Sequence, residues 1–225
     1  METTLLEYQV QDPTSKAQYC IIWLHGLGAS MDDLASLAHQ PPISFLPCRH
    51  VFINAPLRPV TLNAGMTMRA WYDILGLDKD HDIDFAGLEK SRHALMHIIN
   101  AQITAGFSAS QILLAGFSQG GAMALNLAMH SSMDFLGVIA LSAYLPFEPE
   151  LKPRLPKSVP FFLGMGQLDE VVKPKWTELA HETLVNWGYE HLVLKSYPIA
   201  HTISIDEIMD VLQWLHAHTV QVATP

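Results

Sequence analysis

One serine lies in a sequence pattern that is typical of an activated nucleophile. Residues 116–120 read Gly-Phe-Ser-Gln-Gly, so that Ser118 stands between the two glycines of a G-x-S-x-G pattern. An apolar run at 111–115 precedes the pattern, and a helical pattern follows it through Met129. A serine at such a strand-to-helix corner projects from the end of the sheet, and the flanking glycines permit the sharp turn. A helix N-cap would account for the serine but not for the glycines. We therefore interpret Ser118 as a candidate nucleophile.

A serine hydroxyl becomes a good nucleophile when a base accepts its proton and an acid orients that base. Where G-x-S-x-G forms a strand-to-helix corner, the acid and then the base follow the serine along the chain. Asp169 and His201 each come shortly after a predicted strand, in that order. Glu170 is the alternative acid, but we favour Asp169 because the next side chain along would point the opposite way. The sequence thus predicts a catalytic set of Ser118, Asp169 and His201.

Acyl transfer also requires two backbone N–H groups that stabilise the developing oxyanion. One comes from the residue after the nucleophile, which is Gln119. The other is expected in the loop after an early strand, and residues 25–28, His-Gly-Leu-Gly, directly follow the apolar run 19–24. We assign this second donor to the N–H of Leu27. We interpret His25 as a side chain that supports the loop and not as the catalytic base.

Short apolar runs alternate with helical patterns along the chain. Residues 19–24 are continuously apolar and end at glycines, which is typical of a strand that is buried on both faces. This alternation predicts right-handed crossovers and an α/β fold with a mostly parallel sheet and helices on both of its faces. We expect one antiparallel strand at residues 5–10. The other predicted strands cover 51–54, 111–115, 135–141, 160–163 and 191–196, and the predicted helices cover 84–105, 174–187, 205–218 and the stretch from Gly116 through Met129.

No repeat, low-complexity tract or linker interrupts the sequence, and we therefore expect a single domain over residues 1–225. Residues 57–84 are the exception to the regular pattern, because their apolar residues follow neither a period of 2 nor one of 3.6. An irregular stretch of this length in a compact domain is usually functional or disordered.

Composition excludes several classes of protein. The 22 acidic residues outnumber the 13 basic ones, which argues against a nucleic-acid partner because phosphate binding depends on Lys and Arg. Two cysteines cannot form a disulfide framework or a structural zinc site, and His93 and His97 lack a further metal ligand nearby. No apolar stretch is long enough to span a membrane and no secretory signal begins the chain. We expect a cytoplasmic protein without metal or cofactor, and the sequence leaves a homodimer open.

Several segments, in order along the chain, resemble the acyl-protein thioesterase and small carboxylesterase family (phospholipase/carboxylesterase) of α/β hydrolases. The resemblance extends from about residue 20 to the end. The matching residues are 24–28, 55–56, 58–61, 71–73, 116–121, 141–142, Asp169 with 171–172, and 197–198 with His201.

This resemblance implies an α/β-hydrolase fold and a serine hydrolase that acts on esters or thioesters. It implies that Ser118, Asp169 and His201 form the triad and that the amides of Leu27 and Gln119 form the oxyanion hole. It further implies that an irregular insertion at about 64–84 forms a lid over an acyl-binding groove. The side chains that we expect in this groove are Met68, Trp71, Leu75, Leu77, Tyr144 and Leu168.

The leading hypothesis is hydrolysis of short-to-medium acyl esters or thioesters through an acyl-enzyme, with a small ester or an acylated protein or lipid as substrate. The alternatives are a lysophospholipase or peptidase on the same fold, or a ligand-binding member without catalysis. The chain departs from the family at three places. Ala29 and Ser30 stand where Asp is usual, Met165 precedes Gly166 where His is common, and Tyr144 stands where Trp is frequent. The last departure bears on the acyl chain length that is preferred.

Overall fold

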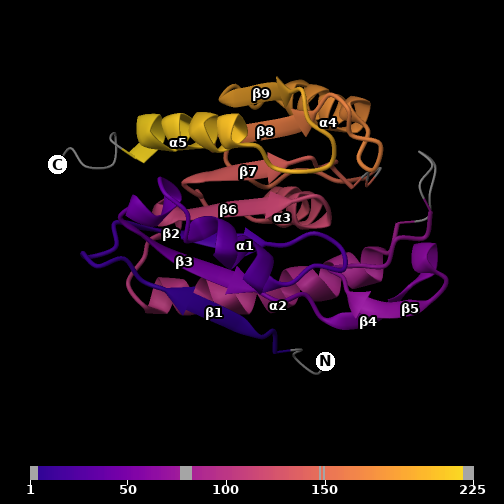
Figure 1. Ribbon diagram of the computed structural model, residues 1–225, viewed down its shortest axis with the longest axis horizontal. Coiled ribbons are helices and arrows are strands. Elements are labelled where there is room, and N and C mark those ends of the chain that lie inside the picture. The colour runs from indigo at the N-terminus through magenta and orange to yellow at the C-terminus, as the bar shows by residue number, and fades with distance from the viewer. Residues whose placement is uncertain (1–4, 77–82, 147, 149, 220–225) are drawn as a thin grey trace.

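The fold is built on a seven-stranded, mostly parallel sheet (Figure 1). The structure is a computed structural model and describes residues 5–76, 83–146, 148 and 150–219. The strand order is β1-β3-β2-β6-β7-β8-β9, and only β1 runs antiparallel to its neighbour. The strands of this sheet are β1 (Tyr8–Gln11), β2 (Tyr19–Leu24), β3 (Cys48–Ile53), β6 (Ile112–Phe117), β7 (Gly137–Leu141), β8 (Phe161–Gly166) and β9 (Leu192–Tyr197).

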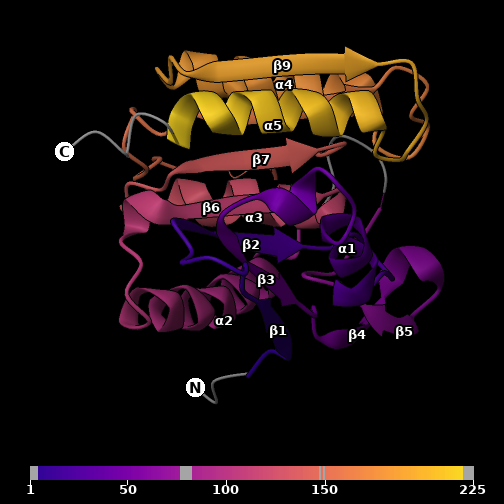
Figure 2. The same cartoon turned by 60° about the vertical axis from the view of Figure 1, so that its left-hand side comes forward.

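Helices cover both faces of the sheet, as predicted. Figure 1 shows α1 (Met31–Ala38) and α5 (Ile205–Thr219) in front of the sheet, with the other three helices behind it. Those three are α2 (Phe85–Thr104), α3 (Gln119–His130) and α4 (Pro174–Asn186), and in the turned view of Figure 2 α5 still lies in front of the sheet and α4 behind it. Among the described helices, none has the length and apolar character needed to cross a bilayer.

The alternation of side chains along β2 divides the core into two clusters. Cys20, Ile22 and Leu24 pack on the face that carries α2, α3 and α4, whereas Ile21 and Trp23 pack on the face that carries α1 and α5. Successive side chains of a strand point to opposite faces, so a continuous apolar run can fill both clusters. This is why the central strands are apolar throughout and not alternating.

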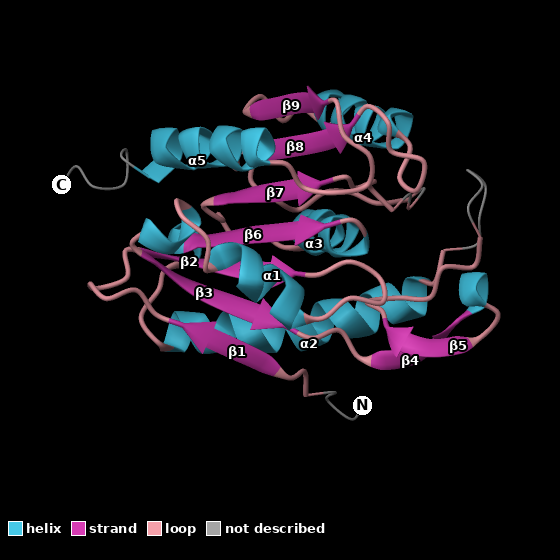
Figure 3. Cartoon of the chain, in the orientation of Figure 1, coloured by secondary structure: helices cyan, strands magenta, loops and turns pink. Residues whose placement is uncertain are grey.

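Two elements were not predicted from the sequence. The first is α1, which begins at a capping box formed by Ser30 and Asp33. The second is an antiparallel hairpin of β4 (Leu57–Val60) and β5 (Met66–Arg69), which lies apart from the main sheet (Figure 3). The hairpin strands are mostly exposed and form no apolar run, and α1 spans only about two helical turns, so the sequence pattern indicates neither of them.

Glu207, in the first turn of α5, is fully buried against β8. A methyl group added to Gly164 of β8 would collide with its Oε1 atom. Neither carboxyl oxygen of Glu207 has a hydrogen-bond partner in the part of the chain that the structure describes. Burial penalises the charged form and raises the pKa of Glu207 from 4.5 to about 7.

We expect Glu207 to make the stability depend on pH. Its pKa is higher in the folded protein than in the unfolded chain, so the free energy of unfolding should fall as the pH rises from about 4.5 to about 7, by roughly 3 kcal/mol. Glu207→Gln stays neutral and should be more stable than the wild type at about pH 8 but not at about pH 4.5. Urea unfolding at both pH values measures the difference, with Glu178→Gln on the exposed face of α4 as control. An equal difference at both pH values would contradict this role of Glu207.

Candidate active site

Ser118 occupies a strained turn between β6 and α3. Its φ of 55° and ψ of −124° lie in a region that residues with a Cβ seldom adopt. The pattern needs its two glycines because a side chain would not fit at either position. A methyl group on Gly116 would collide with the backbone of Gly120. A methyl group on Gly120 would in turn collide with the carbonyl of Leu24. The N–H of Ser118 donates to the carbonyl of Leu141 at 2.9 Å, which fixes the turn against β7.

The structure brings Ser118, His201 and Asp169 together in one hydrogen-bonded line. The Nε2 atom of His201 lies 2.9 Å from Ser118 Oγ, and its Nδ1 atom lies 2.7 Å from Asp169 Oδ2. Ser118 follows the carboxyl end of β6, His201 that of β9 and Asp169 that of β8. These ends lie at one edge of the sheet, as expected from the sequence. With Nδ1–H directed at the carboxylate, Nε2 is free to accept the hydroxyl proton of Ser118.

The carboxylate of Asp169 is held by the backbone around it. Its Oδ1 atom accepts hydrogen bonds from the N–H groups of Val171 and Val172, each at 2.9 Å. The side chain of Asp169 is fully buried, whereas Glu170 is exposed. A buried carboxylate with three hydrogen bonds keeps one orientation, and the geometry therefore favours Asp169 over Glu170 as the partner of the imidazole.

The loop of residues 25–28 lies directly over the turn at Ser118. A Cβ on Gly26 would stand 3.4 Å from that of Ser118. The N–H of Ala55 donates to His25 Nε2 at 3.0 Å, so the proton of the neutral ring is on Nδ1, which donates to the Gly26 carbonyl at 2.7 Å. Burial lowers the pKa of His25, which favours this neutral form. His25 therefore stabilises the loop, in line with the interpretation from the sequence.

Leu27 and Gln119 both border the cavity beside Ser118. The N–H of Leu27 donates to no acceptor within the described ranges of the chain. Gln119 is the first residue of α3, and the first N–H groups of a helix have no partner inside the helix. Two unused N–H groups beside a nucleophile can together stabilise an oxyanion.

Trp71 does not line the cavity, in contrast to the expectation from the sequence. Its ring is fully buried, and its Nε1–H donates to the carbonyl of His25 at 2.8 Å. Its backbone N–H donates to Gln119 Oε1 at 3.0 Å, and Gln119 Nε2 donates to the carbonyl of Tyr72 at 2.8 Å. Trp71 thus connects the 25–28 loop with the start of α3. Apolar character in the sequence could not distinguish this role from contact with a ligand.

A largely apolar cavity of about 260 Å³ opens beside Ser118. Its walls come from residues 72–76 on one side, α4 on the other and residues 144–146 between them. Leu75 and Tyr144 line the cavity as predicted, and Leu77 is outside the described residues. Helical periodicity predicted α4 but did not indicate which of its faces turns toward Ser118. Sequence reasoning therefore missed the lining residues of this helix and its end, which are Trp176, Leu179, Ala180, Thr183 and Trp187.

Met68 and Leu168 were also expected in the groove, and neither lines the cavity. Met68 lies on β5, where its sulfur accepts a hydrogen bond from Asn63 Nδ2 at 3.2 Å and lies near Gly28. Leu168 is 65% exposed, in the turn that follows β8. Leu168 directly precedes Asp169 and Met68 lies near the 25–28 loop, yet neither side chain contributes to the lining of the cavity. Within the described ranges no cluster of three or more His, Cys, Asp and Glu residues could hold a metal ion.

We expect Trp71→Phe to lower both the stability of the protein and its activity. The substitution leaves the buried His25 carbonyl without its donor, which should lower the free energy of unfolding by about 1–3 kcal/mol. If Leu27 supplies an oxyanion donor, the substitution should also lower kcat for p-nitrophenyl acetate and for the octanoate by a similar factor, because that donor would act on the carbonyl that both esters carry. Steady-state kinetics on both esters measure this. A loss that grows with acyl length would instead make Trp71 part of the groove.

Comparisons with known proteins show the family to which this chain belongs. A family model described as Phospholipase/Carboxylesterase matches residues 6–219. Acyl-protein thioesterase 1 of Emericella nidulans is 35% identical over 210 residues, covering 87% of this chain and 88% of that protein. Acyl-protein thioesterase 1 of Candida albicans is 33% identical, covering 89% of this chain and 92% of that protein.

Among solved structures, Zea mays acyl-protein thioesterase 2 superposes with a TM-score of 0.83 at 28% identity, covering 95% of this chain and 99% of that chain. Bacillus cereus carboxylesterase, at 17% identity, shares the fold with a TM-score of 0.78, covering 96% of this chain and 95% of that chain. The predicted α/β-hydrolase fold is confirmed. With almost its whole length matched, this chain belongs to the Phospholipase/Carboxylesterase family of α/β hydrolases.

Proposed function

We propose that this protein is a serine hydrolase that cleaves carboxylic esters and thioesters through an acyl-enzyme. The observation that carries the proposal is the line of hydrogen bonds from Asp169 through His201 to Ser118, which ends at the opening of an apolar cavity. Membership in the Phospholipase/Carboxylesterase family supports the reaction class. The curated relatives are named acyl-protein thioesterases, which supports acyl groups carried on proteins as one substrate class.

In the first half of the proposed reaction, Ser118 attacks the acyl carbonyl. His201 Nε2 accepts the Ser118 proton while Asp169 holds the imidazole and stabilises the imidazolium. The oxyanion of the tetrahedral intermediate accepts hydrogen bonds from the N–H groups of Leu27 and Gln119. When the carbon–oxygen or carbon–sulfur bond breaks, His201 returns the proton to the departing alcohol or thiol. The acyl group is then an ester on Ser118.

The second half repeats these steps with water. His201 removes a proton from water, the hydroxide attacks the acyl-Ser118 ester, and the same two N–H groups stabilise the second oxyanion. Collapse of this intermediate releases the carboxylic acid and returns the proton to Ser118. No step requires a metal ion or an organic cofactor.

The acyl chain is proposed to occupy the apolar cavity, with the insertion at about 64–84 acting as a lid within a single domain. Residues 72–76, on one wall of this cavity, belong to that insertion and support the assignment. Leu75 and Tyr144 contribute to the lining, together with Trp176 of α4. The surface that lines the cavity is mainly apolar, so acyl length should determine selectivity more than the leaving group does.

Replacement of the triad residues tests the mechanism. Ser118→Ala should abolish labelling by a fluorophosphonate and lower kcat by several orders of magnitude. Asp169→Asn should lower kcat by roughly 10⁴, because the imidazole then loses its orienting carboxylate. The matched control is Glu170→Gln, whose exposed side chain makes no contact with the imidazole. Labelling that persists in Ser118→Ala, or a larger loss in Glu170→Gln than in Asp169→Asn, would contradict the assignment.

A series of p-nitrophenyl esters with two to twelve carbons tests the acyl groove. Each methylene buried is worth about 0.8 kcal/mol, so kcat/KM should rise by up to roughly two orders of magnitude from acetate to hexanoate and then level off. Leu75→Ala should reduce the slope of this rise more than it changes the acetate rate. Leu168→Ala is the control, because this exposed side chain is outside the cavity. A steady fall from acetate onward would exclude the groove.

A further inference from the structure

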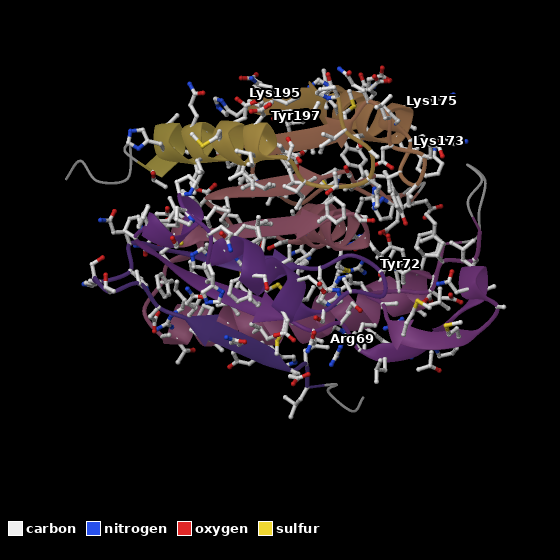
Figure 4. All side chains as sticks on the ribbon, in the orientation of Figure 1. Arg69, Tyr72, Lys173, Lys175, Lys195 and Tyr197 are labelled. Atoms are coloured by element: carbon white, nitrogen blue, oxygen red, sulfur yellow. The ribbon has the colours of Figure 1, made fainter. Side chains whose placement is uncertain are left out.

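Two tyrosines that line the mainly apolar cavity are hydrogen-bonded to each other through their hydroxyls. Tyr72 comes from the segment after β5 and Tyr144 from the segment after β7, and both residues line the cavity. Their Oη atoms are 2.6 Å apart. Figure 4 shows Tyr72 at the side of the molecule toward which the parallel strands point, which is also the side of Ser118.

The hydrogen bond between the two tyrosine hydroxyls leaves one phenolic O–H without an acceptor in the described part of the chain. Two phenols carry two O–H protons, and the hydrogen bond between the hydroxyls uses one of them. Neither hydroxyl has a second partner among the residues that the structure describes. Burial raises the pKa of both Tyr72 and Tyr144, so both phenols keep their protons at neutral pH.

The carboxylates that share the cavity are occupied by other donors. Asp73 accepts from the backbone N–H and the hydroxyl of Thr61, at 2.7 and 2.6 Å. Glu148 accepts from Asn126 Nδ2 at 2.6 Å and is 3.0 Å from His130 Nε2. Neither carboxylate is bonded to the tyrosine pair. Among the described residues, therefore, no acceptor takes the second phenolic proton, and we infer that it can be donated to a molecule in the cavity.

We propose that the Tyr72–Tyr144 pair is a specificity site that recognises an acceptor oxygen, such as an oxo or hydroxyl group, part-way along the acyl chain. This inference rests on the proposed function and names a substrate class within it. A carbonyl that is buried in an apolar cavity without a donor loses its hydration and disfavours binding. An oxygen on the one carbon that faces the pair accepts a hydrogen bond from the free phenolic O–H. This bond takes the place of the hydrogen bond to water that the oxygen lost on burial. The pair thus distinguishes positions along the chain, which apolar walls do not.

A scan of an oxo group along the acyl chain tests this inference in the wild-type enzyme. The substrates are p-nitrophenyl octanoate and its 5-, 6- and 7-oxo derivatives, which have nearly the same size and leaving group. One isomer should exceed the other two in kcat/KM by roughly tenfold, because only its oxygen meets a donor. Equal values for the three isomers, with octanoate cleaved normally, would overturn the inference and leave the proposed function intact.

The double variant Tyr72→Phe/Tyr144→Phe removes both hydroxyls and keeps both rings. The quantity measured is the ratio of kcat/KM between the favoured isomer and the other isomers within each variant, so a general change in rate cancels. This ratio should fall to about one in the double variant. Single variants leave one hydroxyl and should retain part of the preference.

The control is Tyr189→Phe. Its hydroxyl is outside the cavity and donates to the carbonyl of Leu155, and the ratio should stay at the wild-type value. If the preference for one isomer survives in the double variant, another group must cause that preference, and the inference is overturned. Absence of any ester cleavage together with absence of fluorophosphonate labelling would instead contradict the proposed function itself.

Discussion

The sharp turn at Ser118 is the constraint on which the rest of the site depends. A φ of 55° costs about 1–3 kcal/mol in a residue with a Cβ, so the turn persists only where its surroundings hold it. The two strands beside β6 do this. Gly120 packs against the carbonyl of Leu24 at the end of β2, and the N–H of Ser118 bonds to Leu141 at the end of β7. Ser118 is thus held by close backbone contacts to the strands on both sides of β6.

A short series of hydrogen bonds connects the turn at Ser118 with the surrounding loops and fixes their positions. The Gln119 side chain bonds to the backbone of Trp71 and of Tyr72, and the Trp71 ring bonds to the carbonyl of His25. The start of α3, the cavity wall and the 25–28 loop are therefore positioned by the same groups. A movement of the cavity wall would also displace the N–H groups of Leu27 and Gln119 that are proposed to bind the oxyanion. In the proposed reaction, binding of the acyl chain and the geometry of acyl transfer are therefore coupled.

Most of the fold could be predicted because it depends on local patterns. The apolar runs of β2, β6 and β8 are long enough to indicate strands, and the carboxyl ends of parallel strands meet at one edge, which locates Ser118, Asp169 and His201 together. The β4–β5 hairpin was not predicted. Its strands are mostly exposed and are not apolar runs, so nothing in the local pattern indicates that they pair.

The sequence by itself determined the family, the sheet and the order of the three polar residues. It could do so because a serine between two glycines and polar residues directly after buried strands are local features, which can be recognised without knowing how the chain packs. Only the tertiary structure decided which apolar residues line the cavity. Trp71 supports the 25–28 loop, Leu168 faces solvent, and Trp176 of α4 lines the cavity. All three are apolar and near the site in the fold. Their roles differ because the direction of a side chain depends on how distant elements pack, and the residue type does not encode that direction.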